Sequence, residues 1–350
     1  MKNEFFCSEP ADRFSKRKRE KNKLVEYEES DRLKKLKALM LGHALGDALG
    51  VPVEFSSREE LDENPVADMM GWGTHFVPEG CWSDDTAMSL ATLDVLAKGC
   101  FNRNETMQNF ASWLSRGEFT ATGNTFDVGN TCQEAIRRFM ASDSKDAEVW
   151  GLDGECNNGN GSLMRIHPLV AYATFTFLNG SERGYWLWMG CIKAGSELTH
   201  AHSRSVMGCY IYGYCLSFLL KEATRESLIA GIEFAGGDLD YLEEFECYKR
   251  IFEPNFEKLE REEIKSSGYV VDILEAAIWC VLTTKDYKEC VLKAVNLGGD
   301  TDTVAAIAGG LAGVLYGIDA IPKEWLSKLK RREYIEKMCE EAEKNWMHES

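Results

Sequence analysis

Residues 298–317 read GGDTDTVAAIAGGLAGVLYG, an acidic turn that leads directly into a stretch of small and apolar residues. The apolar positions after the turn recur at helical spacing, which predicts a core helix over 303–316. The glycines at 298 and 299 permit a tight backbone turn before that helix. We therefore expect the acidic group Asp300-Thr301-Asp302-Thr303 at the point where a buried helix begins.

A second stretch has the same character. From Leu33 to Leu49, apolar residues fall at i, i+3 and i+4 with glycine and alanine between them, so this helix can approach its neighbours closely. Strand-like alternation is nearly absent from the chain, which indicates an all-α fold built as a single helical bundle. Further helices are expected at 84–99, 104–116, 127–142, 162–178, 184–197, 202–221, 225–235, 270–283, 286–296 and 323–346.

The composition is typical of one large globular domain. The chain has 350 residues, of which 44% are hydrophobic and 28% are charged. Its formal net charge of −17 repels phosphate backbones, so no nucleic-acid partner is expected. The longest near-apolar runs, 206–220 and 304–316, are shorter than the roughly 20 residues that span a bilayer, so no membrane partner is expected.

The cysteines indicate a reducing environment. None of the 12 cysteines forms a CxxC pair, and most lie in apolar helical stretches, where cysteine acts as a small core residue. Residues 1–21 contain no apolar signal core. Both observations favour a cytoplasmic location.

Residues 1–35 form a charge-rich extension ahead of a domain expected at 36–350. A basic run over 16–21 is followed by an acidic run over 26–31. Such a segment is typical of a solvated tail. Alternatively, it is an arm that docks on a partner or on the domain's own surface.

A second acidic motif, Trp82-Ser83-Asp84-Asp85-Thr86, opens the helix expected at 84–99. Two adjacent carboxylates cannot both cap one helix, so one of them needs another partner, and a divalent cation is the natural one. Taken alone, the motif also fits a helix cap beside a solvated neighbour. Its combination with Asp300 to Thr303 favours a shared cation site, because two such loops can place four carboxylates around one cavity.

Oxygen ligands favour Mg²⁺, Mn²⁺ or Ca²⁺ at this site over Zn²⁺. The six histidines show no HExxH motif and no Cys/His cluster in the sequence. Two further acids lie in GDALGVPVEF, residues 46–55. Glu54 follows a helix exit in an apolar stretch, where packing does not explain a carboxylate, whereas Asp47 is either a structural hydrogen-bonding acid or a catalytic one.

The polar loop Asn157-Asn158-Gly159-Asn160-Gly161-Ser162 is a candidate phosphate site. Its glycines let backbone N–H groups approach an anion, and a helix that begins near Ser162 would direct its positive end toward a phosphate. A polar loop with a helix cap looks similar, so this motif alone is a weak signal. Arg165, just beyond it, binds either a ligand or an acidic partner inside the fold.

In this order the four elements resemble the ADP-ribosylglycohydrolase family, of the dinitrogenase reductase-activating glycohydrolase type. The resemblance covers residues 36 to 325 and is carried by GDALGVPVEF, WSDDTAM, NNGNGSLMRIHPL, LTHAHS, SSGYVVDILEAAIWC and AVNLGGDTDTVAAIAGGLAGVLYG. It implies a compact, single-domain, orthogonal all-α bundle. It also implies a central cleft that binds two divalent cations, Mg²⁺ or Mn²⁺.

By motif position, the resemblance assigns roles to single residues. One cation would take Ser83, Asp84, Asp85 and Asp302, and the other would take Asp300, Asp302 and Thr303. Glu54, Asp85 and Asp302 are the implied catalytic residues, with Glu54 as general acid or base. The implied substrate-binding residues are Asn157, Gly159, Asn160, Gly161, Ser162, His200 and Tyr269. For His200 and Tyr269 a place in the core is the alternative.

The implied reaction is hydrolysis at C1″ of the distal ribose, through a transition state that resembles an oxocarbenium ion. SGYVVD and GGDTDT look closer to the arginine-directed branch, which implies ADP-ribosylarginine in a protein as the substrate. ADP-ribosylserine and O-acetyl-ADP-ribose are alternatives.

Two other classes of function stay open at this point. One is an immunity or regulatory protein that also neutralises an ADP-ribosyltransferase toxin by binding it through residues 1–35. The other is a relative without catalytic activity that serves as a binding protein. The complete set of expected ligand positions disfavours the latter.

Overall fold

Two helices whose backbones touch form the centre of the molecule. The computed structural model describes residues 29–142 and 150–346, and in it α2 (Glu29–Gly50) packs along α14 (Thr301–Tyr316). A Cβ atom at Gly42 would lie 2.4 Å from the carbonyl oxygen of Gly309, and one at Gly46 would lie 2.0 Å from that of Ala305. Since no real Cβ atom comes so close to an oxygen, glycine is required for this approach.

The C-terminal end of α2 meets the N-terminal end of α14. The Thr301 hydroxyl donates a hydrogen bond of 2.9 Å to the carbonyl oxygen of Gly50. A Cβ atom at Gly50 would lie 2.3 Å from the Cα atom of Asp302. The acidic turn before α14 is therefore held directly against the segment that leads to Glu54.

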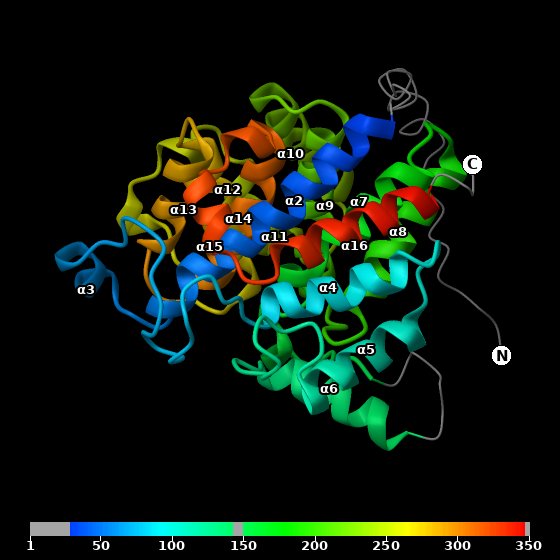
Figure 1. Cartoon of the computed structure of the whole chain (residues 1–350). Helices are drawn as coiled ribbons and strands as arrows, with labels where there is room; N and C mark the ends of the chain where they lie inside the picture. Colours follow the sequence, from blue (N-terminus) through cyan, green and yellow to red (C-terminus); the bar gives the residue numbers. More distant parts are fainter. Residues whose placement is uncertain (1–28, 143–149, 347–350) are drawn as a thin grey trace.

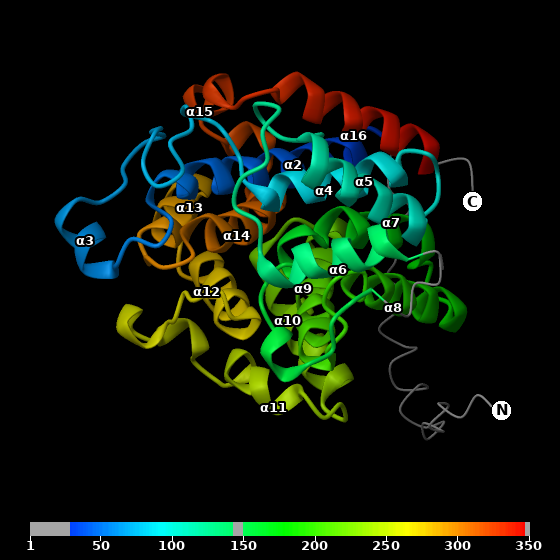
Figure 2. The same ribbon diagram turned by 90° about the horizontal axis from the view of Figure 1, so that it is seen from below.

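The other helices surround this central pair (Figures 1 and 2). Helix α2 lies between α14 and the C-terminal helix α16, and α9 and α10 pack together on the other side of α14. The remaining α-helices of the described residues are α3 (Arg58–Glu63), α4 (Asp84–Leu96), α5 (Arg103–Arg116), α6 (Asn130–Ala141), α7 (His167–Phe177), α8 (Glu182–Ser196), α9 (Ser203–Lys221), α10 (Arg225–Leu239), α11 (Phe245–Tyr248), α12 (Val270–Leu282), α13 (Tyr287–Val295), α15 (Lys323–Lys328) and α16 (Arg332–Trp346).

The predicted all-α fold is confirmed. Within the described ranges, β-pairing is limited to three isolated bridges, and most predicted helices occur within a few residues of their expected bounds. Helices α3 and α11 were not predicted; they have only six and four residues, so neither is long enough to show an apolar helical period.

Three predicted helices were partly wrong. The helix expected at 323–346 is broken into α15 and α16, because Arg331 between them has a left-handed φ of 46° and donates a hydrogen bond of 2.7 Å to the carbonyl oxygen of Thr120. The helix expected at 127–142 begins only at Asn130, after Gly129. Turn and tertiary contacts overrode the helical pattern in both places.

The third partly wrong prediction is the helix expected at 162–178. Leu163–Arg165 form a 3₁₀ turn, and the α-helix α7 begins only at His167. Pro168 lies in the first turn of α7, where its missing N–H costs nothing, so it marks the start of that helix.

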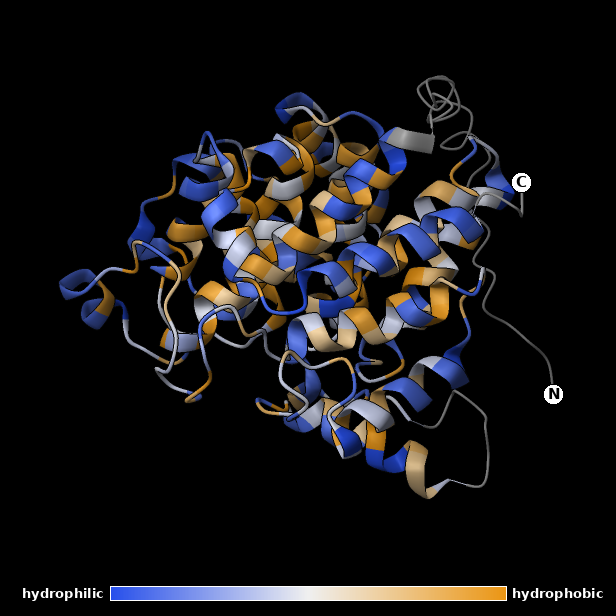
Figure 3. Ribbon diagram, in the orientation of Figure 1, coloured by the Kyte–Doolittle hydropathy of each residue, from blue (hydrophilic) through white to orange (hydrophobic). Residues whose placement is uncertain are grey.

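The core is apolar and the outer loops are polar. Figure 3 shows hydrophobic residues concentrated on the central helices, whereas α3 is largely hydrophilic. Every cysteine in the described part of the chain is free. None of the described helices is both long and apolar enough to cross a membrane.

Residues 1–28 lie outside the described residues. The docking role predicted for the N-terminal extension, with its basic run over 16–21, therefore stays a prediction, and so does the cytoplasmic location. Helix α2 begins at Glu29, before the apolar period that starts at Leu33. The predicted boundary between residues 35 and 36 thus falls inside a helix.

Candidate metal and substrate site

Carboxylates from separate parts of the chain meet beside the ends of α2, α4 and α14. One group joins Asp47, Asp85 and Asp302, and a second joins Glu54, Asp300 and Asp302. Within each group, the candidate ligand atoms lie within 4.8 Å of one another. Because Asp302 belongs to both groups, the two acidic motifs and the Glu54 segment form one site.

Three oxygen atoms of this site are buried without a hydrogen-bond partner among the described residues. They are Oδ2 of Asp85, Oδ1 of Asp300 and Oδ2 of Asp302. An unpaired buried acceptor costs on the order of 1–3 kcal/mol, and more if it is charged. These atoms are therefore available to a ligand.

Divalent cations fit this donor set. Burial, followed by the charges of neighbouring carboxylates, raises the pKa values of Asp85 and Asp302 well above their usual range. The pKa of Asp300 is raised as well, chiefly by burial. Cations with oxygen ligands would occupy the free lone pairs and offset the repulsion between the carboxylates. The carboxylate cluster can thus bind metal ions.

Asp47 has a structural role in this arrangement. Its carboxylate accepts hydrogen bonds from the N–H groups of Ser83 (2.8 Å) and Thr86 (3.0 Å) and from the Thr86 hydroxyl (2.6 Å). Burial raises its pKa to about 6, while these hydrogen bonds lower it. Asp47 therefore fixes the first turn of α4 against α2, which supports the structural alternative for this acid.

The remaining predicted metal ligands are Ser83, Thr303 and Asp84. Ser83 caps α4 by accepting a bond of 3.3 Å from the Asp85 N–H, and the Thr303 hydroxyl lies 3.4 Å from Oδ1 of Asp85. Asp84 is buried. Burial, followed by the charge of Asp127, raises the pKa of Asp84 well above its usual range.

Glu54 links the carboxylate cluster to His75 and Asp127. Nε2 of His75 is hydrogen-bonded to the Glu54 carboxylate, and the candidate ligand atoms of the three residues lie within 4.8 Å of one another. Burial raises the pKa of Glu54 to about 7; the charges of Asp127 and Asp300 add to this rise, and the hydrogen bond with His75 opposes it. That hydrogen bond also raises the pKa of His75. A carboxyl group with a pKa near 7 is suited to proton transfer.

Sequence reasoning missed His75 and Asp127. His75 belongs to no recognisable motif, and hydrogen bonds of the neighbouring Thr74 to the carbonyl oxygens of Glu54 (2.9 Å) and Pro52 (3.0 Å) hold its segment against Glu54. Asp127 was assigned to a predicted helix but lies in the turn before α6, with a φ of 50°. The available signal was Gly129, which disfavours a helix that includes Asp127.

The glycine-rich loop contacts the carboxylates through Asn160. Its side-chain amide donates a hydrogen bond of 2.7 Å to Oδ2 of Asp300. Gly159 forms an isolated bridge with Tyr269, and the Asn160 N–H donates to the carbonyl oxygen of Gly268 at 3.1 Å. The loop and the half-buried Tyr269 therefore lie side by side next to the carboxylate cluster.

The prediction that a helix begins near Ser162 is only partly confirmed, because the helix that begins there is a 3₁₀ turn and not an α-helix. The 3₁₀ turn over Leu163–Arg165 separates the loop from α7, so the loop does not receive the N-terminal end of an α-helix. Pro168 sets the start of α7 instead. Because the amides of Asn157, Asn158 and Asn160 already donate within the protein, backbone N–H groups of the loop remain its candidate donors toward a phosphate.

His200 and Ser162 support the loop from inside the fold. Both side chains are buried, and a Cβ atom at Gly161 would lie 2.8 Å from Cε1 of His200. Nδ1 of His200 lies 2.8 Å from the Thr199 hydroxyl, and the Ser162 hydroxyl accepts a bond of 3.0 Å from Ser196. Their contact with a substrate stays a prediction.

Arg165 is buried behind the same loop. It donates hydrogen bonds to the Thr199 hydroxyl (2.8 Å) and the Gly195 carbonyl oxygen (3.2 Å), and its guanidinium lies over the Phe110 ring at 4.7 Å. Burial, followed by the charge of Arg165, lowers the pKa of His200 to about 3, so this imidazole is neutral.

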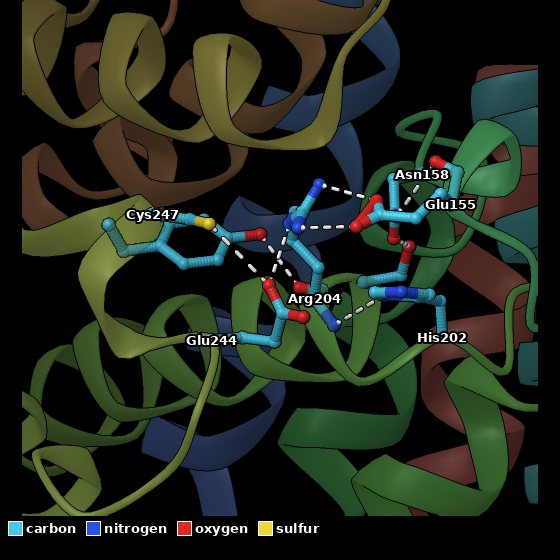
Figure 4. A network of polar contacts seen from close by, with 8 residues as sticks. Glu155, Asn158, His202, Arg204, Glu244 and Cys247 are labelled. Atoms are coloured by element: carbon cyan, nitrogen blue, oxygen red, sulfur yellow. Dashed lines mark hydrogen bonds and ion pairs between the residues drawn. The ribbon is translucent and has the colours of Figure 1, made fainter.

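Arg204 connects Glu155, just before the glycine-rich loop, with Glu244, just before α11, as Figure 4 shows. Its Nε donates 2.7 Å to Glu244, and its two terminal nitrogens donate 3.1 and 3.3 Å to the two oxygens of Glu155. The Ser205 hydroxyl donates 3.0 Å to Oδ1 of Asn158, whose amide donates 3.1 Å to the Glu155 carbonyl oxygen. Side chains of α9, with Glu244 just before α11, therefore position this part of the loop. Nearer α6, the Asn157 amide donates 3.3 Å to the Thr131 hydroxyl.

Known proteins are similar to this chain in sequence. A model of the family described as ADP-ribosylglycohydrolase matches residues 28–349. The chain is 32% identical to ADP-ribosylarginine hydrolase Tri1 of Serratia proteamaculans, over 89% of this chain and 80% of that protein. It is 34% identical to the ADP-ribosyl-(dinitrogen reductase) glycohydrolase of Rhodospirillum rubrum, over 83% of this chain and 88% of that protein.

A solved structure has the same fold. A chain of an ADP-ribosylglycohydrolase-related protein complex superposes with a TM-score of 0.74 at 29% identity, covering 91% of this chain and 100% of that one. The resemblance that the sequence motifs predicted is therefore confirmed.

Proposed function

The chain belongs to the ADP-ribosylglycohydrolase family and is thus a hydrolase, and from this premise we propose that it releases ADP-ribose from modified arginine side chains of proteins. We further propose that it uses two divalent cations, Mg²⁺ or Mn²⁺. The choice of arginine rests on the relatives named as ADP-ribosylarginine hydrolases.

The observation that carries this proposal is the buried carboxylate cluster with its three unpartnered oxygen atoms. Asn160 of the glycine-rich loop contacts it at Asp300, and His75 contacts it at Glu54. The residues that would hold the cations are Ser83, Asp84, Asp85, Asp300, Asp302 and Thr303. Bound cations would supply Lewis-acid contacts to the ribose hydroxyls and polarise a water molecule.

Within this arrangement, the chain's own residues bind the substrate and transfer the proton. The glycine-rich loop and Tyr269 would receive the diphosphate, which places the distal ribose at Asp300 and Asp302. Glu54 would then act as general acid or base at the glycosidic bond, with its proton affinity set by burial and its orientation set by His75.

A panel of substrates tests the reaction. Release of ADP-ribose is measured from ADP-ribosylated arginine, ADP-ribosylated serine and O-acetyl-ADP-ribose, each with Mg²⁺, with Mn²⁺ and with a chelator. We expect release from arginine with a cation and little release with the chelator. Release from serine or the O-acetyl ester alone would overturn the choice of arginine, and full activity with the chelator would overturn the role of cations.

The Glu54→Gln variant tests the acid–base role. Glutamine keeps the shape of the side chain but cannot exchange a proton, so turnover should fall on the order of 10²–10⁴-fold. The Mg²⁺-induced rise in melting temperature should persist. The matched control is Glu59→Gln at an exposed position of α3, which should leave both quantities unchanged. Wild-type turnover in Glu54→Gln would remove this role.

A further inference from the structure

Three large aromatic side chains near Glu54 are exposed to solvent. Phe55 is 68% exposed, Trp72 is 63% exposed and Phe76 is 80% exposed. We name these three residues the aromatic rim. Their exposure opposes the hydrophobic effect, and neighbouring exposed aromatics often mark an interaction site.

The backbone holds the rim in an unfavourable conformation. Phe55, Trp72 and Phe76 have left-handed φ angles of 67°, 75° and 55°, which bulky residues rarely adopt. Such strain is unfavourable and persists where surrounding structure enforces it, often at functional sites. A chain that needed only a turn here would be better served by glycine or asparagine.

Hydrogen bonds enforce this conformation. The Phe55 N–H donates 2.7 Å to the carbonyl oxygen of Gly299, next to Asp300. The Trp72 N–H donates 2.6 Å to the carbonyl oxygen of Val77, and the Phe76 N–H donates 2.8 Å to that of Trp72. The backbone of the rim is therefore anchored partly to the acidic turn itself, so the rings are presented at the site.

The rim adjoins the Glu54 end of the site. His75, which lies within the Trp72–Val77 turn and is hydrogen-bonded to Glu54, has its ring centroid 6.3 Å from that of Phe55 and 5.1 Å from that of Phe126. The glycine-rich loop contacts the cluster through Asn160 at Asp300, which belongs to the same carboxylate group as Glu54. A substrate whose diphosphate lies on that loop would direct its leaving group toward Glu54 and the rim.

We propose that the aromatic rim binds the polypeptide that flanks the modified arginine, and that this polypeptide is basic. The inference rests on the proposed function, because the orientation of the ADP-ribosyl group follows from it. The faces of Phe and Trp rings attract cationic and aliphatic side chains. The formal net charge of −17 and the nearby carboxylates favour a basic segment over an acidic one.

The experiment compares two substrates of the same chemistry and different size. Kinetics are measured with free ADP-ribosylarginine and with a peptide that carries ADP-ribosylarginine between lysine residues. The variants are Trp72→Asn, Phe76→Asn and their combination, because asparagine tolerates a left-handed φ and removes the ring. We expect KM for the peptide to rise about tenfold in the double variant, since anchoring aromatics dominate such contacts. Kinetics with free ADP-ribosylarginine should not change.

Two controls keep the test specific. Trp186→Gln removes an aromatic side chain that is 46% exposed on α8, which lies far from α3 and the loop around it in both Figure 1 and Figure 2, and it should affect neither substrate. A second peptide with glutamate in place of the flanking lysines should be a poorer substrate for the wild-type protein.

Other kinetic results would contradict the proposed role of the aromatic rim. Equal losses with both substrates would show that the rim serves the site itself and not the flanking polypeptide, and unchanged KM for the peptide would remove the rim as a docking surface. A wild-type protein that is equally active on both peptides would contradict the preference for basic segments. If the wild-type protein hydrolysed none of these substrates, the proposed function would fail rather than the rim.

Discussion

The two halves of the candidate site are positioned by different forces. The carboxylate cluster lies at helix ends whose backbones are in contact, as at Gly46 against Ala305, and several of its oxygen atoms have no protein partner. The glycine-rich loop is held by side chains, with Arg204 bound to both Glu155 and Glu244. In the first half, the backbones lie too close for an added Cβ atom, and carboxylate oxygens are free for a ligand. The second half is held by separate side-chain contacts, which can be removed one at a time.

The sharpest test of this difference is Asp302→Asn, since Asp302 belongs to both carboxylate groups. Loss of one charge in a cluster that stabilises the transition state should lower turnover about 10³-fold. The Mg²⁺-induced rise in melting temperature should also disappear. In cation-free protein the variant should melt at a higher temperature than wild type, because burial and like charges penalise the ionised Asp302.

Turnover and thermal melting with and without Mg²⁺ check this prediction. Asp319→Asn, in the turn after α14 and largely exposed, is the matched control. An Mg²⁺-induced shift that survives in Asp302→Asn would show that the cluster does not bind the cation through this residue.

The next largest effect is expected from Gly46→Ala. Its Cβ would lie 2.0 Å from the carbonyl oxygen of Ala305, so α2 and α14 must separate. We expect the free energy of unfolding to fall by about 3 kcal/mol, as in overpacked cores. Denaturant unfolding measures this quantity.

Gly190→Ala is the counterpart on α8. A Cβ atom there meets nothing within 4 Å, and alanine favours a helix over glycine by about 1 kcal/mol, so this variant should be more stable than wild type. Equal effects of both substitutions would contradict the claim that backbone contact positions the carboxylates.

Arg204→Gln should affect the other half of the site more mildly. It removes the bonds to Glu155 and Glu244 and thereby loosens the glycine-rich loop without touching the carboxylates. We expect KM to rise about tenfold, as for loss of a charge-paired hydrogen bond, with kcat nearly unchanged. The control is Arg138→Gln, which removes an exposed ion pair with Glu134 on α6. A fall in kcat at constant KM would show that Arg204 acts on the chemistry instead.

The smallest expected effect is on the pH dependence of stability. Acid stabilises the folded carboxylate cluster but destabilises the half that contains His200. Buried carboxylates with raised pKa values bind protons more tightly in the folded protein, so acid favours their folded state. His200 has its pKa lowered to about 3 by burial, so the unfolded chain takes up a proton below about pH 6.5 that the folded chain does not. The stability that neutral His200 provides is therefore present above pH 6.5 and is lost as the pH falls toward 3.

The free energy of unfolding, measured in saturating Mg²⁺ at several pH values, tests this contribution of His200. Between pH 7.5 and 5.5, wild type should lose about 1.4 kcal/mol more stability than His200→Gln, whatever the stability of the variant at neutral pH. An equal pH dependence in both proteins would show that His200 is charged in the fold.

The sequence predicted the local parts of this protein better than their assembly. The motif at Asp300 and the small-residue pattern after it predicted the start of a core helix, and α14 begins at Thr301. The Glu54 and Asn160 segments were also recognised, since glycine, proline and acidic residues leave a strong local signal. In contrast, Asp127 was placed in a helix, and the break at Arg331 was missed, because hydrogen bonds to distant carbonyl groups decide backbone conformation there.

What the sequence determined by itself is the class of fold and the chemical type of the site. Helical periodicity and the paired acidic turns are local properties, so they can be read without knowing which residues meet. Only the tertiary structure decided that Asp47 supports α4, that His75 binds Glu54, and that His200 lies behind the loop. These roles depend on which surfaces of α2 and α14 come into contact, and packing over the whole chain determines that contact.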